Sequence, residues 1–172
     1  FERQAYGGII NDIGVHSIDQ FLAFADTDEA EIVMSTVGAF GTAPDGFEDF
    51  AEIVMQTPSV RGYVRLDWFT PDGLPTWGDG RLFLIGTEGT LELRKNLDIE
   101  GRAGTDHMFI ANRTTTRHVD CSALPVTYYS DFIADVRDRT QTAAPQSHMF
   151  TVSRMALTAQ AEATRFTARA RP

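Results

Sequence analysis

Three polar side chains near the N-terminus have a spacing that suits proton transfer. Asp12, His16 and Asp19 stand at positions i, i+4 and i+7, so on an α-helix they fall within a sector of about 60°. A carboxylate one helical turn from an imidazole can orient the ring and fix its tautomer. Such a pair could exchange a proton with a substrate hydroxyl. Spacing alone favours a simpler interpretation, in which the pair lies on a solvated helix face and does no chemistry.

A helix over residues 7–25 is predicted to carry these side chains and to end at Asp26. Its apolar stripe lies on the opposite side and comprises Ile10, Ile18, Phe21, Leu22 and Ala25. Strands are predicted over residues 31–39, 47–56, 62–69, 81–85, 90–94, 107–111 and 117–120, and two further helices over residues 128–139 and 148–169. This order predicts an α+β fold, a largely antiparallel open sheet with helices packed on one face.

Composition limits the function classes that are open to the chain. Its 172 residues suit a single domain over residues 1–172. A formal net charge of −9 argues against nucleic-acid binding, and the basic run Arg165, Arg169 and Arg171 is expected to be solvated. No apolar run approaches the roughly 20 residues of a membrane helix. The single cysteine, Cys121, excludes an intrachain disulfide and is compatible with the cytoplasm.

A second group of polar residues lies further along the chain. Trp77, Asp79 and Arg81 cluster in a loop before a predicted strand, where an aromatic face with polar neighbours would suit a sugar ring. A loop tied by an Asp–Arg pair with a packed Trp is an equally good interpretation. His107 follows a glycine-containing loop that could present it to a pocket, although a surface histidine is the simpler reading. The four histidines lack the short spacing of a zinc site, so no metal is predicted.

Several segments, in order along the chain, have the form of one known domain. Paired Gly7-Gly8 precede Asp12, Gly14, His16 and Asp19; Trp77-Gly78-Asp79-Gly80-Arg81 precedes Gly86-Thr87-Glu88-Gly89; and Tyr128-Tyr129-Ser130-Asp131-Phe132 leads into an Ala-rich helix. This ordered set resembles the second domain of the glucose–fructose oxidoreductase, inositol dehydrogenase and rhizopine-catabolism family. The likeness spans nearly the whole chain.

The resemblance implies a site that two domains share. In that family an N-terminal Rossmann domain binds NAD or NADP and supplies a lysine from a Glu-Lys-Pro motif. Asp12 and His16 match the family's catalytic pair, with the histidine as proton acceptor or donor and Asp19 in a structural role. This sequence has no G-x-G-x-x-G and no Glu-Lys-Pro, and its only lysine is Lys95. The cofactor would therefore be bound mainly by an N-terminal domain that this sequence lacks, and the chain alone is predicted to be inactive.

The chain is therefore interpreted as the substrate-binding domain of an NAD(P)-dependent oxidoreductase. Its substrate would be a sugar, polyol or related hydroxyl compound, and the resemblance implies a homodimer or higher oligomer formed through the open sheet face. A non-catalytic module for small-ligand binding or dimerisation is the alternative. A metal-dependent hydrolase is a third possibility, which would require histidines and carboxylates that converge in the structure.

Overall fold

The chain folds as two compact units. The computed structural model describes residues 3–40, 44, 46–74 and 76–167. The first unit comprises Phe1–Phe69 and Ser130–Pro172, and the second comprises Thr70–Tyr129. None of the described helices is both long and apolar enough to cross a membrane.

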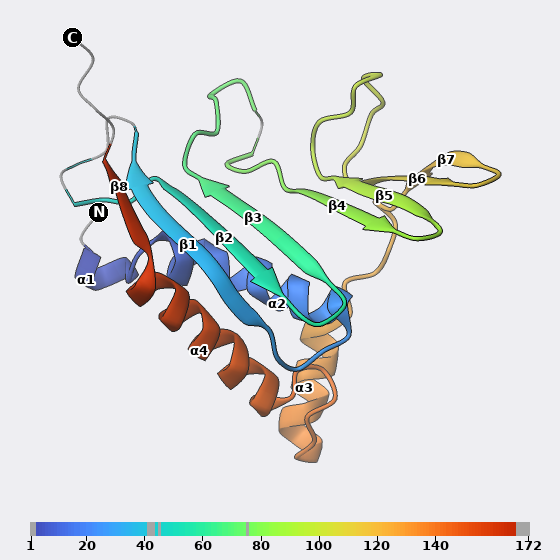
Figure 1. Ribbon diagram of the computed structural model, residues 1–172. Helices are drawn as coiled ribbons and strands as arrows, with labels where there is room; N and C mark the ends of the chain where they lie inside the picture. The colour runs from blue at the N-terminus through green and yellow to red at the C-terminus, as the bar shows by residue number, and fades with distance from the viewer. Residues whose placement is uncertain (1–2, 41–43, 45, 75, 168–172) are drawn as a thin grey trace, which may run out of the picture. The chain divides into compact units, whose positions relative to one another are not determined.

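The first unit is built on a four-stranded sheet with the strand order β3-β2-β1-β8 (Figure 1). Its strands are β1 (Glu31–Ala39), β2 (Phe50–Gln56), β3 (Arg61–Asp67) and β8 (Thr164–Thr167). β2 is antiparallel to both β1 and β3, whereas β8 runs parallel to β1. The helical elements are α1 (Arg3–Tyr6), η1 (Ile10–Gly14), α2 (Val15–Ala25), α3 (Tyr128–Asp138) and α4 (Gln146–Glu162). α2 and α4 lie along the same face of the sheet (Figure 1).

The core of this unit lies between the sheet and those two helices. Alternation in β2 turns Ala51, Ile53 and Met55 inward, and all three side chains are fully buried. The apolar stripes of α2 and α4 pack against them, because residues three and four apart share one helix face. The buried cluster includes Ile18, Leu22, Val37, Val152, Met155, Ala156 and Ala159. The apolar patterns of residues 7–25 and 47–56 are therefore confirmed.

The second unit is a four-stranded antiparallel sheet. Its strands are β4 (Arg81–Gly86), β5 (Gly89–Arg94), β6 (His107–Asn112) and β7 (Thr116–Asp120), which pair in chain order. The β4–β5 hairpin closes with Gly86 opposite Gly89. A Cβ at Gly89 would lie 2.3 Å from the carbonyl oxygen of Ala111 on β6, so this corner of the hairpin requires glycine.

The predicted α+β class with largely antiparallel pairing is confirmed, but the strands divide between two sheets where one was predicted. The helix predicted over residues 148–169 is wrong at its end. α4 stops at Glu162, Ala163 is extended, and residues 164–167 form β8. Pairing with the free edge of β1 outweighs the helix propensity of this Ala-rich segment. Residues 168 and 169 of the predicted helix lie outside the described residues.

A buried carboxylate organises the connection between α3 and α4. Asp135 is 6% exposed and accepts hydrogen bonds from the hydroxyls of Thr140 and Thr142 and from the backbone amides of Thr142 and Ala143. These hydrogen bonds favour the ionised form and hold the pKa of Asp135 well below its usual value. The loop is thus fixed by one side chain that the sequence pattern did not single out.

Candidate functional site

The structure places Asp12 and His16 on the solvent side of the segment that carries them. Asp12 belongs to η1 and His16 to the first turn of α2, and both are exposed. Ile10 and Ile18, on the same segment, are fully buried. The predicted separation of polar and apolar faces is therefore present. Within the described part of the chain, no hydrogen bond ties the two polar side chains to each other.

The segment differs from the continuous α-helix that was predicted. Residues Ile10–Gly14 form a π-helix, in which the backbone amide of Val15 donates to the carbonyl of Ile10. A Cβ at Gly14 would lie 2.9 Å from Cδ1 of Leu66 on β3, so the wide turn rests directly on the sheet. The 60° sector estimated for an α-helix thus does not describe Asp12 relative to His16. Single π-helical turns are frequent at functional sites.

Gly8, the second of the paired glycines at the start of this segment, makes room for a buried polar network. Gly8 has φ +104°, in the region that favours glycine, and its neighbours Ile9 and Ile10 begin the helical segment. The amide of Ile9 donates to Glu48 Oε2 (3.3 Å) and that of Ile10 to Gln160 Oε1 (3.0 Å). Gln160 Nε2 in turn donates to Glu48 Oε2 (2.9 Å). Helix-start amides that have no partner within the helix are thereby satisfied.

Glu48 is a buried carboxylate with partners from both ends of the chain. Its side chain accepts a hydrogen bond from Arg165 Nη2 on β8 (2.8 Å), and its backbone amide donates to Tyr6 Oη (2.9 Å). Glu48 is 1% exposed and Gln160 is 6% exposed. A buried charge needs an opposite charge and hydrogen bonds to be tolerated. Arg165, which the sequence suggested to be solvated, provides that charge.

Sequence reasoning missed Glu48 and Gln160, although one signal was present. Gln160 falls on the apolar stripe of α4, next to Ala159 and one turn beyond Ala156. A polar residue at a stripe position needs a buried partner. Nothing in the pattern around Glu48 identifies that partner, because its contact with Gln160 spans 112 residues of sequence.

Asp19, the third member of the polar spacing, bonds elsewhere. Its Oδ1 lies 2.6 Å from Nε2 of His148 on α4. The contact joins α2 to α4, so Asp19 serves the packing of the two helices instead of orienting His16.

Trp77 and Asp79 lie in the loop that precedes β4 in the second unit, and Arg81 is the first residue of that strand. Asp79 accepts hydrogen bonds from Arg81 Nε (3.1 Å) and from the backbone amide of Asn96 (3.2 Å). Thr70 Oγ1 donates to the carbonyl of Trp77 (2.7 Å), whereas Trp77 itself is 73% exposed. The Asp–Arg pair is therefore present, and it braces a loop that carries an exposed indole.

His107 stands at the start of β6 and is only 1% exposed. Its Nδ1 lies 3.0 Å from Nε2 of His118 on β7. Its Nε2 is buried and has no hydrogen-bond partner in the described part of the chain. Substrate contact through His107 stays a prediction, and the burial of the ring gives it no support.

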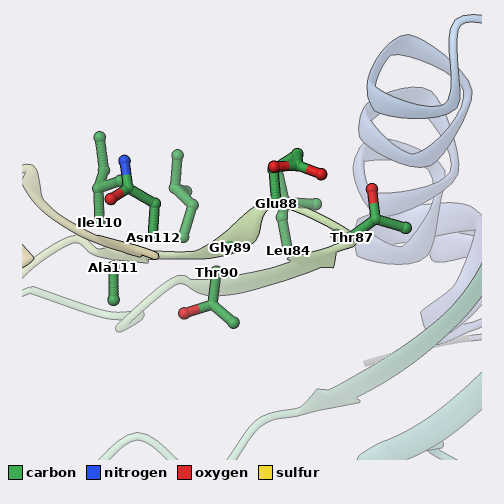
Figure 2. Close-up of a pocket in the computed structure, with 10 residues that line it drawn as sticks. Leu84, Thr87, Glu88, Gly89, Thr90, Ile110, Ala111 and Asn112 are labelled. Atoms are coloured by element: carbon green, nitrogen blue, oxygen red, sulfur yellow. The ribbon is translucent and has the colours of Figure 1, made fainter. Parts of the chain in front are cut away.

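The second unit also carries a hollow beside the β4–β5 turn (Figure 2). Its volume is about 430 Å³, and no predicted site residue lines it. The lining residues are Leu84, Gly86, Thr87, Glu88, Gly89, Thr90, Leu91, Ile110, Ala111 and Asn112. No cluster of three or more His, Cys, Asp or Glu side chains that could hold a metal ion occurs among the described residues. The hydrolase alternative therefore has no observation in its favour.

Comparison with known proteins finds a family model and solved structures that are similar to this chain. The family model described as the GFO/IDH/MocA C-terminal domain matches residues 1–92. A solved structure from Erwinia carotovora atroseptica SCRI1043, described as an oxidoreductase, is 36% identical, with a TM-score of 0.89 over 95% of this chain and 50% of that one. The search of curated proteins gives no match.

Two more distant structures show the same fold. A Thermotoga maritima protein, also described as an oxidoreductase, is 22% identical, with a TM-score of 0.71 over 94% of this chain and 46% of that one. A 3-ketoreductase from Actinomadura kijaniata, solved with NADP and TDP-benzene, is 14% identical, with a TM-score of 0.63 over 95% of this chain and 48% of that one. This chain thus spans about half the length of the solved structures it matches.

Proposed function

This chain belongs to the GFO/IDH/MocA C-terminal domain family, and we propose that it is the substrate-binding half of an NAD(P)-dependent oxidoreductase. The proposed substrate is a sugar, polyol or related hydroxyl compound. One observation carries the proposal: Asp12 and His16 are both exposed on a helical segment whose opposite face is locked into the core. A solvated pair on a firmly seated segment is available to a ligand.

In the proposed reaction His16 accepts the proton of the substrate hydroxyl. Oxidation of an alcohol moves a hydride from carbon to the nicotinamide, and the hydroxyl oxygen must lose its proton as the carbonyl forms. A neutral imidazole accepts that proton, and the Asp12 carboxylate, one turn away, stabilises the imidazolium that results. In the reverse direction the imidazolium returns the proton to the carbonyl oxygen.

The described residues do not fit the pyrophosphate of the cofactor. A glycine turn before a helix can bind phosphate when its backbone amides are free. Here the amide of Ile9 already donates to Glu48 and that of Ile10 to Gln160, and the Glu48 carboxylate would repel a phosphate. NAD or NADP would therefore be held by another part of the complete protein.

We expect this chain alone to bind neither NAD nor NADP with useful affinity. Calorimetric titration of each nucleotide into the chain should give no saturable heat, because the amides of Ile9 and Ile10, at the helix start that follows Gly7 and Gly8, are already hydrogen-bonded. Complete protein titrated in parallel is the positive control. Micromolar binding by the chain alone would overturn the assignment of the cofactor to another domain.

The open face of the first sheet supports the proposal of a homodimer. α2 and α4 cover the other face (Figure 1). Phe50, which alternates along β2 with the inward-facing Ala51 and Ile53, lies on the open side and belongs to an aromatic cluster. Phe40 packs against Phe50 and Phe166, with ring centroids 5.0 and 4.7 Å away. Phe40 is nevertheless 48% exposed and Phe166 is 42% exposed. Apolar side chains gathered on one sheet face are typical of an association surface.

Met34→Glu is expected to convert the dimer to a monomer in light scattering at micromolar concentration. Met34 lies on β1, is 44% exposed and pairs with Val54 of β2, so an added carboxylate would be buried at the proposed interface. Phe24→Glu is the matched control, since Phe24 is 52% exposed on α2, on the helical side of the sheet. A monomeric native chain, or the same mass for native protein and both variants, would contradict the proposed interface.

The proposed class of substrate also depends on this family membership. The exposed indole of Trp77, beside the Asp79–Arg81 pair, suits stacking against a sugar ring. A carbohydrate-like substrate is therefore proposed for the second unit's loop. A cytoplasmic location stays a prediction that rests on the single cysteine.

A further inference from the structure

We propose that Glu48 and Gln160 are positioning residues, which fix the start of the helical segment so that Asp12 and His16 are presented in one arrangement. Their importance for catalysis rests on the proposed function, whereas the positioning itself can be measured without any reaction. Neither side chain reaches the solvent, since Glu48 is 1% exposed and Gln160 6% exposed. Both act through the backbone.

Glu48 and Gln160, together called the clamp, join the start of the helical segment to two distant parts of the fold. Glu48 lies 39 residues from Ile9 and just before β2, whereas Gln160 lies 150 residues from Ile10 and near the end of α4. A local cap would satisfy these amides without fixing the segment in space. Acceptors from separate elements fix it relative to the sheet and to α4 together, and the Gln160–Glu48 bond of 2.9 Å makes the two acceptors one unit.

Backbone hydrogen bonds link the start of the helical segment to the residues of the proposed catalytic pair. The amide of Asp12 donates to the carbonyl of Gly8 (3.0 Å). The amide of Val15, the residue before His16, donates to the carbonyl of Ile10. Ile10, which Gln160 holds, is thus bonded directly to the residue before His16, and Gly8, the neighbour of Ile9, is bonded to Asp12. A displacement of Ile9 and Ile10 is therefore expected to move both side chains.

The test uses the ring signals of His16 and amide hydrogen exchange in the native chain and three variants. Gln160→Leu removes the acceptor of Ile10 and one partner of Glu48. It should speed exchange at Ile9 and Ile10 by on the order of 10-fold, the effect of losing one hydrogen bond, and it should shift the His16 ring resonances. Ile53→Val is the matched core control, because Ile53 is fully buried in the same cluster and makes no contact with the clamp through hydrogen bonds. It should leave both readouts unchanged.

Glu48→Gln tests the same contacts with an isosteric side chain. The Ile9 amide and Gln160 Nε2 both donate to Oε2 of Glu48, whereas Arg165 donates to Oε1. A glutamine at position 48 can place its amide oxygen where Oε2 lies, which keeps both of those hydrogen bonds and loses only the one from Arg165. Native-like exchange at Ile9 and Ile10 and native-like His16 signals are expected. This variant also keeps the test decisive if Gln160→Leu fails to fold.

The outcomes separate this inference from the proposed function. Unchanged His16 signals and Ile9 and Ile10 exchange in folded Gln160→Leu would overturn it, as would equal shifts in Ile53→Val. Glu48→Gln with the signals of an unclamped segment would also overturn it. In the complete enzyme Gln160→Leu should lower kcat and leave KM nearly unchanged. A complete protein that shows no oxidoreductase activity would refute the proposed function and leave the positioning result standing.

Discussion

His16→Ala in the complete enzyme is expected to lower kcat by on the order of 10²–10⁴-fold, with a much smaller change in KM. That range is the usual contribution of a positioned general acid or base. The exposed imidazole lies on a segment whose start is clamped by buried side chains, so its loss should remove proton transfer without disturbing the fold. Steady-state kinetics with a substrate that supports turnover measure the effect.

Two further variants test whether the loss of kcat in His16→Ala is due to the missing imidazole ring. Asp12→Asn should also slow turnover, because it removes the negative charge that is proposed to stabilise the imidazolium and keeps the side chain's shape. Gln20→Ala, an exposed change on the same helix, should leave kcat and KM near native. If a lysine of another domain takes the proton instead, the loss in His16→Ala would appear mainly in KM. Native kcat and KM in His16→Ala would reduce the pair to a solvated helix face.

Gly8→Ala is expected to destabilise the chain by about 2–6 kcal/mol, the sum of backbone strain and overpacking. Gly8 has φ +104°, and a Cβ there would lie 2.4 Å from Cδ of Gln160. The new methyl group would strain the backbone and push the buried amide away from Ile10. Since domains are stable by only about 5–15 kcal/mol, part of the protein could fail to fold. Urea unfolding measures the loss.

Gly46→Ala separates the two contributions to that loss. Gly46 also has a positive φ, +86°, yet among the described residues, its chain neighbours aside, no atom lies within 4 Å of a Cβ built on it. This variant should therefore lose only the strain contribution, about 1–3 kcal/mol. Equal losses in the two variants would mean that Gln160 moves aside at no cost, and the clamp would then be looser than the structure indicates.

The elements that could be predicted from the sequence are those whose periodicity reflects a single buried face. Alternation in β2 and the stripe of α2 both report burial against one neighbour, so Ile53 and Leu22 were placed correctly. The end of α4 was not, because residues 164–167 leave the helix to pair with β1, and the propensity of a segment carries no information about a free sheet edge.

In the candidate site, too, some features follow from the sequence pattern and others depend on contacts between distant residues. The exposure of Asp12 and His16 follows from spacing, since the stripe through Ile10 and Ile18 fixes which side is buried. The π-helical turn and the Glu48–Gln160 clamp do not follow, because both depend on contacts between residues far apart in sequence. The burial of His107 against His118 likewise arises from strand pairing between β6 and β7.

The most direct test of the account follows an isotope through the complete protein. A mixture of sugars and polyols deuterated at the carbinol carbons would be incubated with the protein and oxidised nicotinamide, and the reduced nicotinamide analysed by mass spectrometry. Deuterium in the reduced nicotinamide is predicted for native protein and Gln20→Ala, with a yield that falls on the order of 10²-fold or more in His16→Ala. Reduced nicotinamide without deuterium, or an equal deuterated yield from His16→Ala, would contradict the account.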